Sequence, residues 1–114
     1  MIKVMAIISV KPGKTAEEAY QLWREKHPAY AKKHLLPELR KYKFDKIISS
    51  VKVITDKGEL GDEINVGIPE LYFDDIESAQ RAFARMNANP PDEFLSSIKI
   101  HARLIVEEEE ISLP

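Results

Sequence analysis

The chain has 114 residues, of which 44% are hydrophobic and 32% are charged, and its formal net charge is −2. This size and composition suit one globular domain over residues 1–114 and argue against a disordered chain. The near balance of 17 basic and 19 acidic residues leaves no electrostatic footprint for nucleic acid or an anionic membrane. The lack of cysteine excludes disulfides and thiolate zinc sites.

No apolar run approaches the roughly 18 residues that a membrane span needs, and no charged-then-apolar leader is present. The cysteine-free composition also fits a reducing compartment. We therefore expect a cytoplasmic protein without a membrane span.

The first elements are predicted from an apolar run and a capping pattern. Residues 2–10 are rich in β-branched side chains and end at a Lys-Pro-Gly turn at 11–13, which predicts a strand. Thr15 followed by Glu18 is a capping box, so a helix should begin there and run to about Lys33. The predicted inward face of this helix has the spacing of one helical side and consists of Ala16, Tyr20, Trp23, His27, Tyr30 and His34.

The middle of the chain predicts two strands around a loop. Residues 40–54 form the second predicted strand, 55–63 a polar loop with two glycines, and 64–73 the third strand. Because proline cannot donate to a sheet ladder, Pro69 predicts an edge strand or a bulge.

A second helix and a last strand complete the pattern. Asp74 and Glu77 form a second capping pattern, and residues 87–91 end the helix. The predicted buried face of this helix is Ile76, Ala79, Phe83 and Met86. Residues 94–98 are expected to add one turn, and 98–109 the last strand. The order predicts an α+β, ferredoxin-like βαββαβ fold, in which a four-stranded antiparallel sheet carries both helices on one face.

Alternation along the strands assigns side chains to the two faces of this sheet. The set expected beneath the helices is Ile2, Val4, Ala6, Ile8, Val10, Ile100, Ala102, Leu104 and Val106. The set expected on the open face is Lys3, Met5, Ile7, Ser9, Lys99, His101, Arg103 and Ile105, joined by Tyr42, Phe44, Ile68, Glu70 and Tyr72. An open face of this mixed kind needs a cover, so we expect a homodimer packed sheet to sheet around a pocket.

His27 is the first candidate for chemistry. It shares a helical stripe with Trp23 and Tyr20, and an imidazole beside an aromatic pocket can act as acid or base near neutral pH. Pro28 removes a helical donor and predicts a kink that aims the imidazole into a cavity. The alternative is a partly buried histidine with a structural role only.

His101 and Glu70 are further candidates, because a histidine and a carboxylate in a partly dry pocket form a workable acid–base pair. Their alternative is a surface ion pair on the sheet. No metal is expected, since His27 and His34 are two helical turns apart, about 10 Å, and cannot grip one ion. No nucleotide-binding glycine motif occurs.

Several motifs resemble the EthD family of dimeric α/β-barrel proteins. That family has a K-P-G turn, a T/S-x-E-E-F helix start and a W-x-x-x-H core, which residues 11–13, 17–18 and 22–27 resemble. Residues 70–74 are similar to its E-x-x-F-D segment, and 106–109 to its closing V-x-E-E. The chain departs from the pattern in two places, because Pro28 follows His27 directly and the helix-start aromatic is shifted to Tyr20.

The resemblance implies a homodimer whose barrel encloses a hydrophobic site. Relatives include polyketide cyclases, dehydratases, decarboxylases, muconolactone-type isomerases and cofactor-free oxygenases. We accordingly expect an enzyme without a bound cofactor that performs acid–base chemistry on a small apolar or aromatic carbonyl compound, with the reaction type and substrate left open. The expected catalytic residues are His27, Glu70 and His101, and the expected ligand contacts are Trp23, Tyr30, Tyr42, Phe44 and Tyr72.

Two other functions fit the same residues. One is a dimeric protein that binds a hydrophobic metabolite without transforming it, in which His27 only donates or accepts a hydrogen bond. The other is an EthD-type oxygenase or oxidoreductase accessory protein, with haem supplied by a partner.

Overall fold

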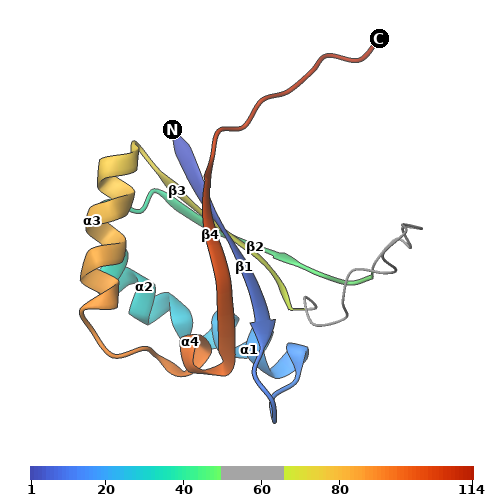
Figure 1. The fold of residues 1–114 in the computed structure, drawn as a ribbon, viewed down its shortest axis with the longest axis vertical. Coiled ribbons are helices and arrows are strands. Elements are labelled where there is room, and N and C mark those ends of the chain that lie inside the picture. The colour runs from blue at the N-terminus through green and yellow to red at the C-terminus, as the bar shows by residue number, and fades with distance from the viewer. Residues whose placement is uncertain (50–65) are drawn as a thin grey trace.

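A four-stranded antiparallel sheet lies at the centre of the computed structural model, which describes residues 1–49 and 66–114 (Figure 1). Its strands are β1 (Ile2–Val10), β2 (Lys41–Lys46), β3 (Gly67–Phe73) and β4 (Ile98–Val106), in the spatial order β2-β3-β1-β4. The helices are α1 (Ala16–Glu25), α2 (His27–Leu35), α3 (Ile76–Asn87) and the short α4 (Glu93–Ser97).

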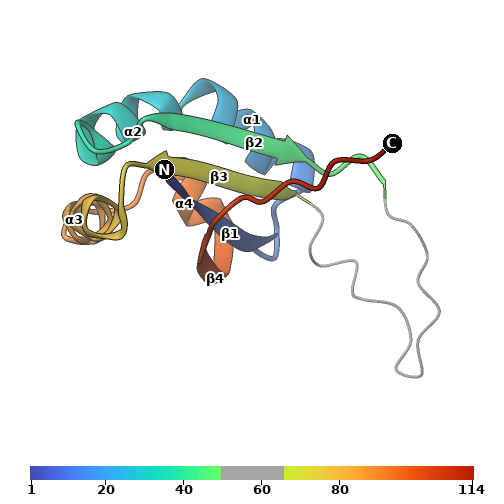
Figure 2. The same cartoon turned by 90° about the horizontal axis from the view of Figure 1, so that it is seen from above.

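The helices pack against one face of the sheet. Ala19 of α1 shares a buried cluster with Ala6 and Ile8 of β1, and Ala82 of α3 shares another with Val4. These β1 residues alternate along the strand and therefore lie on the same face. Figure 2 shows the twisted sheet passing from β2, beside α1 and α2, to β4. The predicted ferredoxin-like α+β fold is confirmed.

The first predicted helix is two helices that meet at Lys26. The capping box is present, because the Glu18 amide donates to Thr15 Oγ1 at 3.1 Å and the Thr15 amide to Glu18 Oε1 at 3.1 Å. The expected kink is a full break between α1 and α2, where Pro28 has no amide to continue the α1 ladder. His27 is consequently the first residue of α2.

The second predicted helix begins one residue later than its capping pattern suggests. Asp75, not Asp74, caps α3 and accepts from the Ser78 amide at 2.7 Å. Asp74 instead pairs with Arg40 at 2.7 Å. Ile76, expected in the buried face, is 44% exposed, because it lies to the side of the stripe that α3 buries, which consists of Ser78, Ala79, Ala82 and Met86.

Two strand predictions also need correction. The second strand ends at Lys46 and not at residue 54; residues 50–54 of that prediction, the 55–63 loop and residues 64–65 lie outside the described part of the chain. Pro69 lies in β3, an interior strand, and not at a sheet edge. The last described pair between β1 and β3 is Met5–Glu70. Pro69, which has no amide to donate, is the residue next to this pair and lies outside the β1–β3 ladder.

A β-bulge between β1 and β4 changes the facing of β4. Ile8 pairs with Ile100 and Ile7 with Ala102, so His101 is an extra residue on β4. One inserted residue reverses the inward and outward alternation beyond it. The prediction was therefore right for Ile100 and His101 and wrong from residue 102 onward: Arg103 and Ile105 face the helix side, and Ala102, Leu104 and Val106 face the open side.

The core lies between the sheet and the helices, and Phe73 is among its largest fully buried side chains. The Phe73→Ala variant should lose about 3–5 kcal/mol of unfolding free energy, because it removes a large buried ring and leaves a cavity. Urea denaturation measures this loss. The control is Ile111→Ala, where the side chain is 77% exposed and little change is expected; equal effects of both substitutions would contradict this description of the core.

Candidate functional site

His27 is the buried centre of a partly buried chain of three polar side chains. Only 2% of the residue is exposed, and its two ring nitrogens have different partners. Nδ1 lies 2.7 Å from Asp92 Oδ2, and Nε2 lies 3.1 Å from the Tyr42 hydroxyl. The helix break at Lys26 and the start of α4 thus bring α2, α4 and β2 together at one imidazole.

Asp92 is a functional candidate that the sequence reasoning missed. It caps α4 by accepting from the Leu95 amide through Oδ1 at 2.9 Å, which leaves Oδ2 for His27. The available signal was an aspartate two residues before the predicted helical turn at 94–98, since aspartate is typical of an N-cap. Nothing in the spacing indicates that its second oxygen meets a histidine 65 residues earlier in the chain.

The hydrogen bonds on Asp92 set the tautomer of His27. Burial acts to raise the pKa of the Asp92 carboxyl, but hydrogen bonds from His27 and the Leu95 amide outweigh burial, so the pKa is lowered. An ionised carboxylate only accepts hydrogen bonds, and Nδ1 therefore carries a proton. In the neutral imidazole, Nε2 is then an acceptor for the Tyr42 hydroxyl.

Tyr42 lies on the helix side of the sheet, which corrects the predicted open-face position of Tyr42 and Phe44. Tyr42 pairs with Leu71 and Phe44 with Pro69, and both partners face the helices. The expectation failed because a half-buried strand with charged residues on alternate positions fits either facing. Burial raises the pKa of the Tyr42 hydroxyl, so it is a neutral donor at physiological pH.

An aromatic cluster surrounds this polar chain. The Trp23 ring lies 5.5 Å from that of Tyr42 and 4.8 Å from that of Phe44, and Tyr30 stacks on His27 at 5.7 Å. Gly67 leaves room for the Phe44 ring, which a Cβ atom at that position would overlap. The ligand contacts predicted at Trp23, Tyr30, Tyr42 and Phe44 are therefore close to one another and to His27.

A cavity of about 220 Å³ opens beside His27 and Tyr42; we call it the Trp23 cavity. Its remaining walls are mainly apolar and consist of Trp23, Pro28, Ala31, Lys32, Leu36 and Leu39. An apolar cavity of roughly 150 Å³ can hold benzene. The Trp23 cavity therefore has room for a substituted ring or a short aliphatic ligand against the two polar groups.

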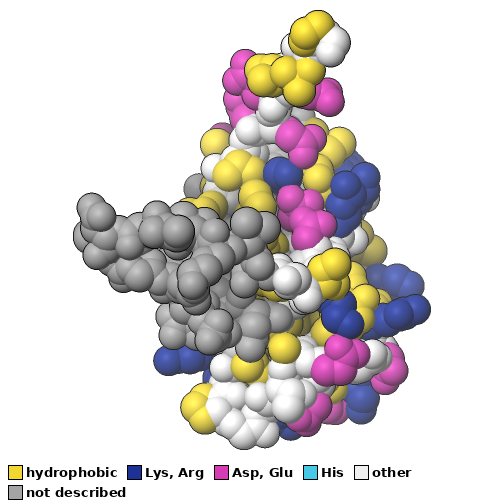
Figure 3. Space-filling model, turned by 90° about the vertical axis from the view of Figure 1, so that its right-hand side faces the viewer, with side chains coloured by type: hydrophobic (Ala, Val, Ile, Leu, Met, Phe, Trp, Pro, Cys, Tyr) yellow, Lys and Arg dark blue, Asp and Glu magenta, His cyan; other side chains and the backbone are white. Residues whose placement is uncertain are grey.

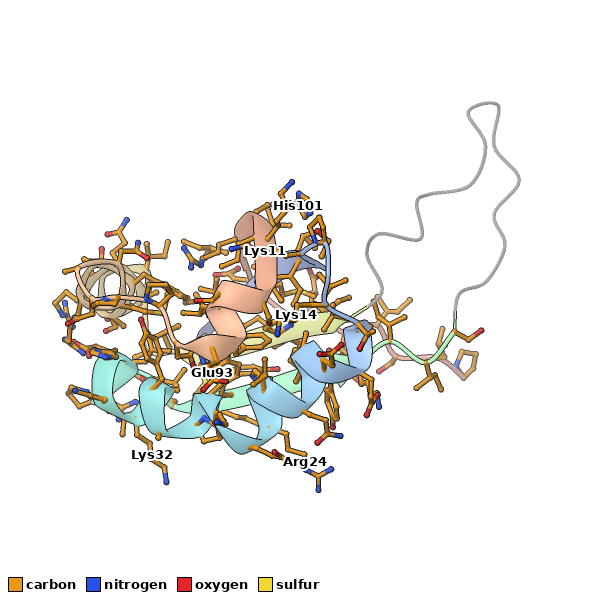
Figure 4. All side chains as sticks on the ribbon, turned by 90° about the horizontal axis from the view of Figure 1, so that it is seen from below. Lys11, Lys14, Arg24, Lys32, Glu93 and His101 are labelled. Carbon is orange, nitrogen blue, oxygen red and sulfur yellow. The ribbon has the colours of Figure 1, made fainter. Side chains whose placement is uncertain are left out.

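Glu70, Tyr72 and His101 lie on the other face of the sheet, apart from His27. Figure 4 shows His101 on the opposite side of the molecule from α1 and α2, whose Arg24 and Lys32 point the other way. The single chain thus does not bring the three predicted catalytic residues together. The sheet separates His27 from Glu70 and His101.

On the open face, the polar residues have structural partners. Lys3 Nζ bonds Glu70 at 2.9 Å and Glu108 at 2.8 Å, and both contacts raise the pKa of Lys3, with Glu108 the stronger. His101 Nε2 lies 2.7 Å from Ser9 Oγ. Glu70 pairs with Met5, four residues from Ser9 and roughly 13 Å along the strand, so Glu70 and His101 do not form an acid–base pair.

Tyr72, also on the open face, is surrounded by cations. The amino groups of Lys3, Lys41 and Lys43 lie 5.9, 5.4 and 5.6 Å from its ring centroid. Contacts of this kind stabilise charge at a surface. Within one chain, this ring is on the opposite face from the Trp23 cavity.

Among residues 1–49 and 66–114, no group of three His, Cys, Asp or Glu side chains could hold a metal ion. In the same described part, none of the helices combines the length and apolar character needed to cross a membrane.

Comparison with known proteins shows the fold. An EthD family protein from Bacillus halodurans aligns at 23% identity over 96% of this chain and 99% of its own, with a TM-score of 0.59. A hypothetical Arabidopsis thaliana protein, in its crystal structure, aligns at 16% identity over 100% of this chain and 99% of its own, with a TM-score of 0.56. No family model and no curated protein matches the sequence. The chain therefore has an EthD-like fold, and at these identities the likeness carries no activity with it.

The Asp92–His27 contact predicts a pH dependence of stability. The lowered pKa of Asp92 means that its contribution is present above the unfolded value of about 4 and is lost as the pH falls through the folded value. The Asp92→Asn variant keeps a good helix cap but removes the charge. Its deficit in unfolding free energy relative to wild type should shrink as the pH is lowered below about 4. Urea denaturation as a function of pH measures it; a constant deficit would contradict the ionic contact.

Proposed function

We propose that this protein is an enzyme that transfers a proton at carbon in a small apolar or aromatic carbonyl compound bound in the Trp23 cavity. The observation that supports it is the Asp92–His27–Tyr42 chain, whose last two members line that cavity. A base oriented by a carboxylate next to a neutral hydrogen-bond donor is the arrangement that enolisation requires.

Each residue has a distinct role in this mechanism. The Tyr42 hydroxyl turns from His27 to donate to the substrate carbonyl oxygen, which frees the lone pair on Nε2. His27 Nε2 then removes a proton from the carbon next to the carbonyl, and the negative charge passes to the oxygen held by Tyr42. The imidazolium so formed is stabilised by Asp92, and it returns the proton to another carbon or to a leaving group. The first return is an isomerisation and the second an elimination.

The surroundings support this use of the polar chain. The imidazole and the Tyr42 hydroxyl have mainly apolar and aromatic neighbours, and in such a site hydrogen bonds and charges act more strongly than in water. Trp23 and Leu39 offer a surface for the apolar body of the ligand. Because the pKa of Tyr42 is raised by burial, its role is that of a donor and not of a base.

The test is hydrogen–deuterium exchange at the carbon next to a ketone, followed by proton NMR in deuterated water. β-Tetralone and phenylacetone are suitable probes, because each joins a ring to an enolisable carbonyl. Wild type should accelerate the exchange above the buffer rate. His27→Gln should lose about 100-fold or more of that acceleration, and Tyr42→Phe a similar amount.

The matched control is Tyr20→Phe, because Tyr20 belongs to the same aromatic cluster and does not line the Trp23 cavity. It should keep the wild-type rate. Equal acceleration by wild type and His27→Gln would refute the assignment of the base. Ketones that bind but are recovered without exchange would instead favour the binding-protein function.

We also propose that two chains associate through the open sheet face. Within the described residues, no helix covers this face, and its apolar members are Met5, Ile7, Ile68, Ala102, Leu104 and Val106. Figure 3 shows the side away from α3, where hydrophobic side chains lie between acidic and basic ones. Leu104 is 48% exposed in the single chain. A second copy would remove this apolar area from water.

Leu104→Glu should weaken the dimer, because it places charges on an apolar contact surface. Sedimentation velocity over a range of concentrations should find wild type as a dimer and the variant shifted toward monomer. The control is Leu113→Glu, since Leu113 is 80% exposed in the C-terminal segment and not on the sheet. A monomeric wild type, or equal shifts in both variants, would contradict this interface.

A further inference from the structure

Arg103 is a cation in a position where the sheet pattern calls for an apolar residue. The β-bulge at His101 turns it to the helix side of β4, opposite Ala6. Bulges are common next to functional sites, where they re-aim a side chain. Without the extra residue, Ala102 would occupy this face.

No carboxylate pairs with Arg103 among the described residues. The other arginines near acidic groups are paired, as Arg85 is with Glu38 at 2.8 Å and Arg40 with Asp74 at 2.7 Å. The contact of the Arg103 guanidinium is with the face of the Phe83 ring, 4.9 Å from Cζ to the centroid. Arg103 is an exposed residue in the single chain, although the partial burial of its guanidinium lowers the pKa of that group. A partly desolvated cation of this kind attracts an anion.

Arg103 borders a cavity of about 260 Å³, which we call the Arg103 cavity. Its polar walls include Tyr30, Asn87 and Asn89, and its apolar walls are Met86, Pro91, Leu95 and Ile100. The cavity is therefore large enough for an aromatic or branched aliphatic group, and it has a fixed positive charge at one wall. Asparagine and tyrosine side chains add neutral donors that suit a carboxylate.

The Arg103 cavity lies next to the proposed catalytic chain. Tyr30 forms one of its walls and also stacks on His27. A narrow gap of about 30 Å³ is lined by His27, Tyr42 and Arg103 together. Arg103 also acts electrostatically on the Tyr42 hydroxyl, where its positive charge opposes the effect of burial on the Tyr42 pKa.

We propose that the Arg103 cavity is a binding site for a small organic acid, with the carboxylate on Arg103 and the apolar body against Met86, Leu95 and Ile100. The planar guanidinium offers two parallel donors to a carboxylate, which gives orientation as well as affinity. A ligand held in this way would be separated from His27 by the ring of Tyr30. Binding at this site depends on Arg103 and the cavity beside it, and it does not depend on proton transfer by His27.

The test compares naphthoate with naphthamide, which have the same ring system and differ in charge. Isothermal titration calorimetry should find that wild type binds naphthoate about tenfold or more tightly than naphthamide, as expected for hydrogen bonds to a charged group. Arg103→Gln should bind the two equally. Arg103→Lys should keep part of the preference, because it retains the charge but not the paired donors.

Two controls locate the effect. Arg24→Gln removes a cation that points away from the molecule and should keep the full preference (Figure 4). His27→Gln should also keep it, so failure of the proposed catalysis and failure of this site give different results. In wild type, naphthoate should shift the NMR signal of the Arg103 side-chain Nε–H, a readout that needs no variant to fold.

Three results would overturn the proposal. They are equal binding of naphthoate and naphthamide by wild type, no binding of naphthoate at all, and a preference for naphthoate that survives in Arg103→Gln.

Discussion

The hydrogen bond between Asp92 and the buried imidazole of His27 is the contact on which the site depends. It joins the start of α2 to the start of α4, two segments 65 residues apart in the chain. A buried imidazole with an unsatisfied nitrogen would cost about 1–3 kcal/mol, so both of its nitrogens need partners. Asp92 satisfies Nδ1 and Tyr42 satisfies Nε2. The positions of α2, α4 and β2 are thereby coupled through one ring.

The same contact explains why the break in the first helix matters for function. A continuous helix would carry His27 in its interior, where its facing follows from helical periodicity alone. Pro28 ends the α1 ladder and lets α2 begin at His27 in a direction of its own. The imidazole then meets Phe94, 4.8 Å away between ring centroids, beside the Asp92 cap. The break that Pro28 causes in the helix thus allows the tertiary contact between His27 and Asp92.

The sheet divides the polar residues into two groups, one on its open face and one on its helix side, which differ in their surroundings. On the open face, Lys3, Glu70 and His101 are held by ion pairs and hydrogen bonds at a surface that a second chain could cover. On the helix side, His27 is buried among apolar and aromatic side chains, where hydrogen bonds act more strongly, and the exposed Arg103 lies over the Phe83 ring. The likeness to the EthD family structure shows the fold, and the chemistry depends on the individual side chains.

Local patterns along the chain were enough to predict the order of the strands, the two main helical regions and the capping box at Thr15. These features follow from local geometry, since helical and strand periodicities and cap chemistry act over a few residues. The prediction of the first strand was right for the same reason, because a β-branched apolar run ended by a Lys-Pro-Gly turn is a local signal.

Which residues contact one another depends on the packing of segments that are far apart in the chain. The single extra residue at His101 reversed the facing of Arg103, and no local pattern marks it because β4 carries apolar residues on both faces. Tyr42 could face either way until its pairing with Leu71 placed it beneath the helices. The partnership of Asp92 with His27 depends on the packing of α4 against α1 and β4, a long-range arrangement that short-range spacing does not encode.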